Sequence, residues 1–538
     1  MHLSNLFGKS KEKNSYLICV NLCALLLCMV VALICCCNKY GFHEDEYYTY
    51  YSSNRTDGFW VEDGAMISRD TILREFMVVP GEGFNFSLVK QVQSWDVHPP
   101  IYYFVIHFVS SITPGLFSMW QGLGINLVCF LICLILMKLL GDSIFKADSL
   151  MSTLVTVAWG FSAATLTSVV FIRMYMMLTL WILAVSLLHA KEYEKHQGVW
   201  FYIVLAILTF LGFMTHYYFF IWLFCLALFF NLRILLVDRK LKPILLYLAT
   251  MIVSFGCSYL FYPAWPAQMF RGQRGAQATG NFVDISNTFS RLSFFAEIVN
   301  RIGFGGISFI LIALLVCLLL AGLFLSNKAK ENREQLRDSK LPLCLIFLGA
   351  GLGYFCIVSK TALMLGDSSI RYQTPILGVE YIALFAGIMI LTELFAKNLM
   401  ALKGIVFVLI ICNGMSILGG NISFLYPEEK DHIELISQYP EATTVYAFNP
   451  DPSSVWCVWA STEELLVPSE VYFTSGDMTE AISDEDIAHM GDADQIILYV
   501  DDGVDKEAVL NKIKSINSKI STTEPGFTHK FCEMYICK

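Results

Sequence analysis

Charged residues are scarce in this chain. Of its 538 residues, only 15% are Asp, Glu, Lys or Arg, whereas 56% are hydrophobic. A soluble globular protein carries about 25% charged residues, so this composition excludes an ordinary soluble enzyme. A transmembrane helix needs about 20 consecutive apolar residues, and many stretches of the sequence approach or reach that length. We therefore predict a polytopic α-helical membrane protein.

The sequence also lacks a surplus of basic residues. Its formal net charge is −9, which argues against nucleic acid as a partner, because nucleic acids are bound through clusters of Lys and Arg. Membrane lipids are the predicted surroundings instead. No internal repeat is visible, and no A-x-A cleavage site follows the first apolar run, residues 16–37. That run is therefore predicted to be a retained transmembrane helix rather than a cleaved signal peptide.

Cysteines outside the apolar segments are few. Of 17 cysteines, only Cys457, Cys532 and Cys537 lie in the polar C-terminal part. The others occupy hydrophobic segments, where cysteine behaves as a small apolar residue. The three polar-region cysteines can form one disulfide if this part is extracytoplasmic, or they can remain three free thiols.

The apolar runs predict about 11 transmembrane helices. Their ranges are 16–37, 119–140, 151–171, 176–189, 200–214, 219–236, 243–262, 304–325, 341–358, 376–395 and 402–418. Every second connection is basic, and the positive-inside rule assigns these connections to the cytoplasm. The basic set comprises the N-terminus, Lys138 and Lys146, Lys191 and Lys195, Arg233, Arg239, Lys240 and Lys242, Lys328, Lys330, Arg333, Arg337 and Lys340, and Lys397 and Lys403. This pattern predicts a cytoplasmic N-terminus and an extracytoplasmic C-terminus.

Two parts of the chain follow from this topology. Residues 1–418 are predicted to be a transmembrane module with a large outer loop at 38–118, in which 99–112 form a helix lying in the membrane interface. Residues 419–538 are predicted to be a small extracytoplasmic α/β domain. Strand-like runs at Thr443–Phe448 and 495–500 and a helical pattern at 506–516 support the second prediction.

An acidic cluster, Glu44, Asp45 and Glu46, follows the first apolar run. A carboxylate near a membrane surface can accept a proton from an attacking hydroxyl or amine. The acid-x-acid pattern can also bind a divalent cation, so metal binding stays open. A solvated acidic loop is the simplest alternative.

A second cluster, Asp96-Val97-His98-Pro99-Pro100, precedes the predicted interfacial helix. The two prolines restrict the backbone there, and an imidazole at this position can bind a phosphate. A histidine that only caps the helix is the alternative.

Isolated cations recur in the predicted outer connections. Guanidinium groups suit phosphate, although an arginine at a helix end can also simply snorkel to the interface. The residues assigned to substrate binding on this ground, with neighbouring polar residues, are Arg173, Tyr175, His216, Arg271, Arg274, Lys360, Arg371 and Tyr372, in addition to Asp96 and His98.

The order of these motifs resembles the GT-C superfamily of membrane glycosyltransferases, in particular the protein O-mannosyltransferase and aminoarabinose-transferase-like branch. The matching elements are Asp45-Glu46, His98-Pro99-Pro100-Ile101-Tyr102-Tyr103, Arg173-Met174-Tyr175, Thr215-His216-Tyr217 and Arg371-Tyr372, over roughly the first 380 residues. The resemblance implies an inverting transfer of a sugar from a polyprenyl-phosphate donor. Asp45 then matches the catalytic aspartate, and Arg173, His98 and Arg371 match donor-side positions. Many relatives carry an arginine where this chain has Trp120-Gln121-Gly122.

The predicted function is therefore a hexosyl or pentosyl transferase in the bacterial plasma membrane. Asp45 and Glu46 are its candidate catalytic residues, and the acceptor is a lipid, a glycan or a protein of the cell envelope. No cofactor is assigned, and a divalent cation stays open. The alternative is a transporter or flippase for a lipid-linked or anionic substrate. Transporters usually place polar residues at mid-membrane and contain repeats, which this sequence does not suggest. A receptor would not need so many spans.

Overall fold

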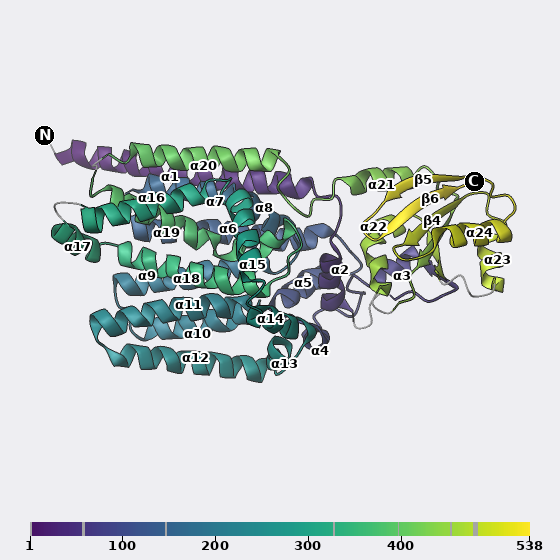
Figure 1. Cartoon of the computed structure of the whole chain (residues 1–538), viewed down its shortest axis with the longest axis horizontal. Helices are drawn as coiled ribbons and strands as arrows, with labels where there is room; N and C mark the ends of the chain where they lie inside the picture. Colours follow the sequence, from purple (N-terminus) through teal and green to yellow (C-terminus); the bar gives the residue numbers. More distant parts are fainter. Residues whose placement is uncertain are drawn as a thin grey trace. The chain divides into compact units, whose positions relative to one another are not determined.

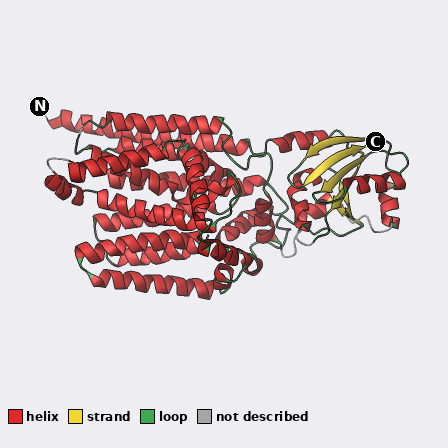
Figure 2. Cartoon of the chain, viewed as in Figure 1, coloured by secondary structure: helices red, strands yellow, loops and turns green. Residues whose placement is uncertain are grey.

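The structure is a computed structural model that describes residues 3–55, 60–145, 148–325, 329–395, 398–451, 454–476 and 482–538. Lys146, Lys328 and Lys397 of the basic connections lie outside these ranges. Most of the described chain is helical (Figure 2). It forms two compact units. Unit 1 consists of Met1–Cys36, Gln93–Tyr102 and Gly122–Ser423, and unit 2 consists of Cys37–Val92, Tyr103–Gln121 and Phe424–Lys538.

Unit 1 is a bundle of long apolar helices (Figure 1). Its α-helices are α1 (Leu3–Cys37), α6 (Met119–Phe145), α7 (Ser149–Gly160), α8 (Ala163–Val170), α9 (Tyr175–Glu194), α10 (Val199–Phe213), α11 (Tyr218–Arg233), α12 (Leu241–Phe261), α13 (Trp265–Phe270), α14 (Gln273–Val283), α15 (Thr288–Ile298), α16 (Ser308–Leu320), α17 (Ala329–Arg337), α18 (Leu341–Thr361), α19 (Thr374–Thr392) and α20 (Met400–Leu418). Short π or 3₁₀ turns, η1 (Ile234–Asp238), η2 (Val299–Gly303), η3 (Ala321–Leu325) and η4 (Ser368–Tyr372), extend or join them.

Helix α19 forms the centre of this bundle. It packs against α9, α16 and α18, and α11 covers the other side of α18. Nearly every side chain of α19 is buried, so an all-round apolar sequence is required there. Large aromatic residues fill the spaces around it, among them Trp159, Tyr354 and Tyr381. The bundle thus buries its own core as well as offering an apolar outer surface.

Seven helices of the described residues are long and apolar enough to cross a membrane, and the number is nine if each of two bent pairs counts as one span. The bent pairs are α7 with α8, at 58°, and Thr288–Gly303 with Ser308–Phe324, at 99°. All 11 ranges predicted from the sequence overlap helices. Nine of them correspond to these spans, and the other two, 176–189 and 200–214, overlap α9 and the 15-residue α10. The length and composition of these helices therefore identify an integral membrane protein with seven to nine candidate membrane-spanning segments.

Unit 2 combines a sheet with short helices (Figures 1 and 2). Its elements are α2 (Glu44–Asn54), β1 (Ala65–Ser68), α3 (Arg69–Arg74), α21 (Glu428–Ile436), β2 (Thr443–Phe448), η5 (Val455–Ser461), α22 (Thr462–Leu465), β3 (Glu470–Ser475), α23 (Asp484–Met490), β4 (Ile496–Asp501), α24 (Lys506–Ile516), β5 (Thr523–Thr528) and β6 (Cys532–Cys537). Helices α4 (Phe86–Trp95) and α5 (Ile101–Ile112) belong partly to each unit.

The sheet has six strands in the order β1-β3-β2-β4-β6-β5. Strand β2 pairs in parallel with β3 and β4, and the other pairings are antiparallel. The central strands β2 and β4 are buried on both faces, which explains their nearly continuous apolar sequences. One face packs on α23 and α24 through a core that includes Met490, Val509 and Ile513. The predicted strands at Thr443–Phe448 and 495–500 and the helix at 506–516 are confirmed as β2, β4 and α24.

Strand β1 was missed by sequence reasoning. It lies within the predicted outer loop, and it extends the sheet by pairing antiparallel with β3, with Ala65 opposite Phe473. Residues 37–92 and 103–121, which the sequence grouped with the transmembrane module, therefore pack with residues 424–538. Cys457, Cys532 and Cys537 are free thiols, so the disulfide alternative is not realised.

Candidate active site

Four polar connections between apolar helices meet in unit 1. They are the α4–α5 loop, the α8–α9 turn, the α10–α11 turn and η4. In chain order they carry Asp96 and His98, Arg173 and Tyr175, His216, and Arg371 and Tyr372. These residues lie at helix ends because an ionised group in the middle of an apolar helix would lose its hydration without compensation. Four sequence motifs that are far apart in the chain thus supply one set of neighbouring side chains.

Asp96, His98 and Arg173 form the charged part of this set. His98 Nδ1 lies 3.2 Å from Asp96 Oδ2, and Arg173 Nη2 lies 3.5 Å from the same imidazole nitrogen. Burial acts to raise the pKa of Asp96, but the hydrogen bond and charge of His98 and the charge of Arg173 outweigh it and hold that pKa below its ordinary value. Asp96 is therefore an anion that orients His98 beside the buried guanidinium of Arg173.

His216 adds a neutral imidazole. Its ring centroid lies 5.8 Å from that of His98. Burial, reinforced by the positive charges of His98 and Arg173, lowers the pKa of His216 well below its ordinary value. The backbone N–H of Tyr218 donates to His216 Nδ1 at 3.0 Å, so the ring proton resides on Nε2. At neutral pH His216 is consequently a hydrogen-bond donor rather than a cation.

Arg371 lies among aromatic rings. It is only 2% exposed, and its guanidinium carbon lies 5.2 Å from the Phe171 ring centroid and 5.0 Å from that of Tyr372. These are cation–π distances. The ring centroids of Tyr372 and Tyr175 lie 5.8 Å apart, and those of Tyr175 and His216 lie 5.5 Å apart. A continuous aromatic wall therefore links Arg371 with the imidazole, and the set holds more positive than negative charge.

Asn126 on α6 fixes the turn that carries Arg173. Its side-chain amide donates to the carbonyls of Val169 and Phe171, at 3.1 and 2.7 Å. Its Oδ1 accepts from the Tyr102 hydroxyl at 3.2 Å. Asn126 is fully buried, so these bonds satisfy backbone groups that would otherwise be costly to bury. Sequence reasoning missed it, although an asparagine within a long apolar helix was the available signal.

Gln268 on α13 fixes the loop that carries Asp96. Its Nε2 donates to the carbonyls of Gln93 and Asp96, at 2.8 and 2.7 Å, and contacts the Tyr262 hydroxyl at 2.9 Å. The Tyr217 hydroxyl donates to its Oε1. Gln268 thus ties the Asp96 loop to the turn beside His216. Nothing in the sequence singled it out.

Three predicted substrate residues lie outside this set. Arg271 and Arg274 are exposed, and Arg274 Nη1 donates to Gln277. Lys360 is buried, but its amine donates to the Asp284 carbonyl at 2.6 Å and to the Thr288 hydroxyl at 3.0 Å, as well as to Asn287. Its charge therefore holds the connection between α14 and α15. None of the three contacts Asp96, His98, Arg173 or His216 among the contacts that the structure describes.

Asp45 lies in unit 2, in the first turn of α2. The Asp45 backbone N–H donates to His43 Nδ1 at 3.1 Å, so His43 caps the helix. The Asp45 side chain is 37% exposed and its Oδ2 lies 3.8 Å from His43 Nδ1. A partly exposed carboxylate on a capped helix is fixed in position and accessible. Glu44 makes a similar approach to His43, at 3.1 Å.

Glu46 has a different environment from Asp45. It is fully buried, and its Oε2 accepts from Lys39 Nζ at 2.9 Å and from the His43 backbone N–H at 2.6 Å. Lys39 also donates to the Phe424 carbonyl at 2.7 Å. These contacts complete a capping box at the start of α2. Glu46 therefore anchors the helix that presents Asp45.

One group of described residues has the composition and spacing to hold a metal ion: Glu429, His432, Glu464 and His529, all in unit 2. The acidic cluster Glu44, Asp45 and Glu46, where the sequence left metal binding open, is not part of it. Glu429 and His432 are three residues apart on α21, a spacing that puts both on one helix face. That pattern was the only local signal, because Glu464 and His529 are distant in the sequence.

No family model matches the chain, and no curated protein gives a significant sequence match. Among solved structures, the chain is similar to ArnT from Cupriavidus metallidurans bound to undecaprenyl phosphate, with 11% identity, a TM-score of 0.49, and 96% of this chain and 97% of that chain covered. It is also similar to the archaeal oligosaccharyltransferase AglB from Archaeoglobus fulgidus in complex with an inhibitory peptide and a dolichol-phosphate. For AglB the identity is 10% and the TM-score is 0.39, with 93% of this chain and 71% of that chain covered. The function proposed below rests on the side chains of the site rather than on these likenesses.

Proposed function

We propose that this protein is a membrane glycosyltransferase that moves a sugar from a polyprenyl-phosphate donor to an acceptor of the cell envelope. The observation that carries the proposal is the gathering of Arg173, His98 and His216 around one point, with Asp96 orienting His98. A guanidinium, a held imidazole and a neutral N–H donor are the groups that an anionic phosphate needs. They lie at the ends of apolar helices, where the lipid chain of such a donor can stay among apolar side chains.

In this proposal the cluster acts on the leaving group. Transfer breaks the bond between the sugar carbon and a phosphate oxygen, and negative charge accumulates on the departing phosphate. Arg173 compensates this charge beside the imidazole of His98, and His216 donates a hydrogen bond from Nε2 without bringing a charge of its own. Preorganised donors of this kind lower the barrier because they need no reorganisation during the reaction. Arg371 and its aromatic neighbours line the same cluster.

Asp45 is proposed as the general base that takes the proton of the attacking acceptor hydroxyl or amine. The motif resemblance and the capped, partly exposed position on α2 support this role. Glu46 is proposed to contribute indirectly, by fixing α2. The acceptor is proposed to be a lipid, a glycan or a protein, and the sugar a hexose or a pentose.

The membrane topology belongs to the same proposal. We propose 11 spans, the nine above together with α9 and α10, in the bacterial plasma membrane. An odd number of spans puts the two termini on opposite sides, and the basic connections support a cytoplasmic N-terminus with residues 419–538 outside. Single-cysteine labelling in a cysteine-free background tests this: membrane-impermeant maleimide should react with a cysteine at exposed Asp492 in intact cells, and with one at exposed Lys195 only after lysis.

The central experiment measures transfer from a radiolabelled polyprenyl-phosphate sugar to envelope acceptors by the purified full-length protein. Asp45→Asn should reduce turnover by about 10²–10⁴-fold, the usual contribution of a general base. Exposed Asp70→Asn is the matched control. Full activity of Asp45→Asn would remove Asp45 from the mechanism. Facilitated movement of the donor across vesicles, with no transfer by any preparation, would favour the transporter alternative.

The donor site is tested separately. Arg173→Ala should weaken kcat/KM for the donor by roughly 10- to 150-fold, because a charge-assisted hydrogen bond contributes about 1.5–3 kcal/mol. Exposed Arg274→Ala should change it less than twofold. Equal donor dependence in the two variants would contradict phosphate binding by Arg173.

A further inference from the structure

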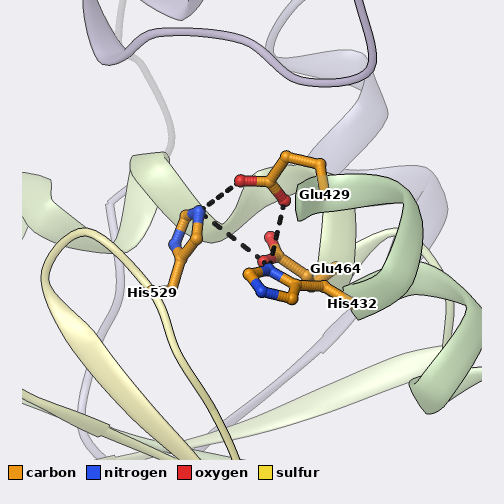
Figure 3. A group of neighbouring side chains, drawn as sticks. All are labelled: Glu429, His432, Glu464 and His529. Carbon is orange, nitrogen blue, oxygen red and sulfur yellow. Dashed lines mark hydrogen bonds and ion pairs between the residues drawn. The ribbon is translucent and has the colours of Figure 1, made fainter. Parts of the chain in front are cut away.

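A buried cluster of two carboxylates and two imidazoles lies in unit 2, and none of its four residues is assigned to transfer. Figure 3 shows Glu429, His432, Glu464 and His529 turned toward one another. Glu429 and His432 come from α21, Glu464 from α22, and His529 from the connection between β5 and β6. Three separate chain segments therefore converge on one small volume.

The four groups are both buried and close. Glu429 is 1% exposed, Glu464 0%, His529 6% and His432 9%. Glu429 approaches His529 Nε2 with Oε1 at 2.5 Å and His432 Nδ1 with Oε2 at 3.7 Å. Glu464 Oε1 lies 3.4 Å from His432 Nδ1 and 3.7 Å from His529 Nε2. One ligand atom from each residue can be chosen so that all lie within 4.8 Å of one another.

These separations suit a small tetrahedral cation. With metal–ligand bonds of about 2.0–2.1 Å, neighbouring ligand atoms of a tetrahedral ion lie about 3.3 Å apart. The distances from Glu464 Oε1 to the two imidazoles, 3.4 and 3.7 Å, and from Glu429 Oε2 to His432, 3.7 Å, are within about 0.4 Å of that value. Two imidazoles with two carboxylates form a nitrogen and oxygen donor set that suits Zn²⁺. Calcium and magnesium favour sets made wholly of oxygen. The two carboxylate charges also neutralise a divalent ion, which matters in so buried a place.

The surroundings orient the ligands further. His529 Nδ1, the nitrogen that faces away from the cluster, lies 3.5 Å from the Ser461 hydroxyl. A metal-binding imidazole usually engages a partner through its second nitrogen, which fixes its tautomer. The His432 ring stacks on Phe527 with centroids 3.8 Å apart and planes at 5°. Both rings are thus held with a nitrogen directed at the carboxylates.

We propose that Glu429, His432, Glu464 and His529 bind one Zn²⁺ ion in a closed structural site. Four protein ligands leave no position for a substrate, which is the property that separates structural from catalytic zinc sites. The ion joins α21, α22 and the β5–β6 connection.

The site also reaches the helix that carries Asp45. Glu463, the chain neighbour of the ligand Glu464, accepts hydrogen bonds from the Tyr47 hydroxyl and the Phe42 backbone N–H. Tyr47 lies on α2, and the closely packed Gly41 leaves no room for a Cβ beside Glu429. Zinc binding therefore stabilises the contact surface of α2. An effect of zinc binding on sugar transfer rests on the proposed function. The metal site itself does not depend on that function.

Without a metal, the same four side chains would be an ion-pair network. Burial acts to lower the pKa of His432, but hydrogen bonds to Glu429 and Glu464 and their charges raise it to about 9. Protonated imidazoles would then compensate the carboxylates. The network and the zinc site predict different metal contents and different responses to added zinc, so they are distinguished by experiment.

The first test uses the unaltered full-length protein, purified in detergent through an affinity tag without histidine. Elemental analysis after gel filtration should find about one zinc per chain. Chelator-stripped protein should recover one zinc per chain, with a Tm increase of about 5–10 °C when free Zn²⁺ is about 100 times the Kd. Magnesium at the same concentration should not raise the Tm. Absence of stoichiometric zinc together with no Tm response to added zinc would overturn the proposal in favour of the ion-pair network.

The second test assigns the site to its residues. Glu464→Gln and His529→Gln should each lose the bound zinc and the zinc-dependent rise in Tm. Exposed Glu434→Gln, on the same helix as Glu429, and exposed His196→Gln should keep both. Zinc retained by both cluster variants at one per chain would overturn the assignment. If the cluster variants do not fold, the measurements on stripped wild-type protein decide alone.

Hydrogen exchange tests the link to α2. Zinc-stripped wild-type protein should exchange the amides of Glu44–Asn54 faster than the zinc-loaded protein, whereas α24 should change little. Equal exchange of α2 in the two states would overturn the coupling.

Discussion

The ion pair between Lys39 and Glu46 gives the sharpest prediction of stability. Both side chains are fully buried, with Lys39 Nζ 2.9 Å from Glu46 Oε2. Lys39 also donates to the Phe424 carbonyl, so it joins the start of α2 to the residues that lead into α21. Lys39→Met removes the cation and leaves the Glu46 carboxylate buried with the His43 backbone N–H as a remaining donor.

The cost follows from burial. Breaking a buried ion pair by removing one partner costs about 3–5 kcal/mol, because the remaining charge is uncompensated. For a unit of this size, roughly 2–4 °C of Tm corresponds to each kcal/mol, so Lys39→Met should lower the Tm of unit 2 by about 6–20 °C. Glu46→Gln should cost a similar amount. The double variant should cost no more than either single variant, because it leaves no buried charge and the introduced amide oxygen can still accept from the His43 backbone N–H.

The assay is thermal unfolding of the detergent-solubilised protein, followed by intrinsic fluorescence, with hydrogen exchange of α2 to assign the transition to unit 2. The exposed pair Arg55–Glu82, whose side chains are 27% and 54% exposed, is the matched control. Arg55→Met should cost at most about 1 kcal/mol. Additive effects of Lys39→Met and Glu46→Gln, or a Lys39→Met effect as small as that of Arg55→Met, would refute the reasoning.

Three further predictions concern other parts of the molecule. Burial raises the pKa of Asp501 to about 6, despite the hydrogen bond from Tyr446. Because this folded-state pKa lies above the unfolded-state value, the free energy of unfolding should fall by up to about 3 kcal/mol as the pH rises from about 4 to 6. Asp501→Asn should remove this loss in pH-dependent unfolding, and an unchanged pH profile would contradict it. Gln268→Leu should raise the KM for the sugar donor and destabilise the protein by about 1–3 kcal/mol, because the carbonyls of the Asp96 loop lose their hydrogen-bond donor. An unaltered KM would count against a positioning role of Gln268. Lys360→Met should change the donor KM less than twofold in transfer assays, and a large increase would return Lys360 to the donor site.

The candidate site shows which residues a sequence can nominate. Arg173 was nominated because an arginine at the end of an apolar run is costly unless it snorkels or is paired. His216 was the weakest nomination, with a satisfied interfacial histidine as its alternative, and both residues lie in the cluster. Lys360 met the same criterion and binds backbone and side-chain oxygens of the 284–288 connection instead. The sequence records that a cation is present, but the direction of its side chain depends on segments that fold beside it. Gln268 was missed for the same reason, since a glutamine acquires its role only from the loop that it contacts.

The sequence by itself determined the class of this protein. Long apolar segments avoid water, so the long apolar helices of unit 1 were predicted from the sequence, and so were the apolar strands β2 and β4. The shorter helices α13, α14, α15 and α17 were not predicted, and α7 and α8 were predicted as one span. Tertiary structure alone decided what distant segments form together. Strand β1 joins the sheet because the edge of β3 offers unpaired backbone groups, and no local pattern of four residues records that. Glu429 and His432 share a helix face, but Glu464 and His529 reach them only through the packing of α22 and the β5–β6 connection. Local patterns fix local structure, whereas a site made from three segments exists only when the buried core holds those segments in place.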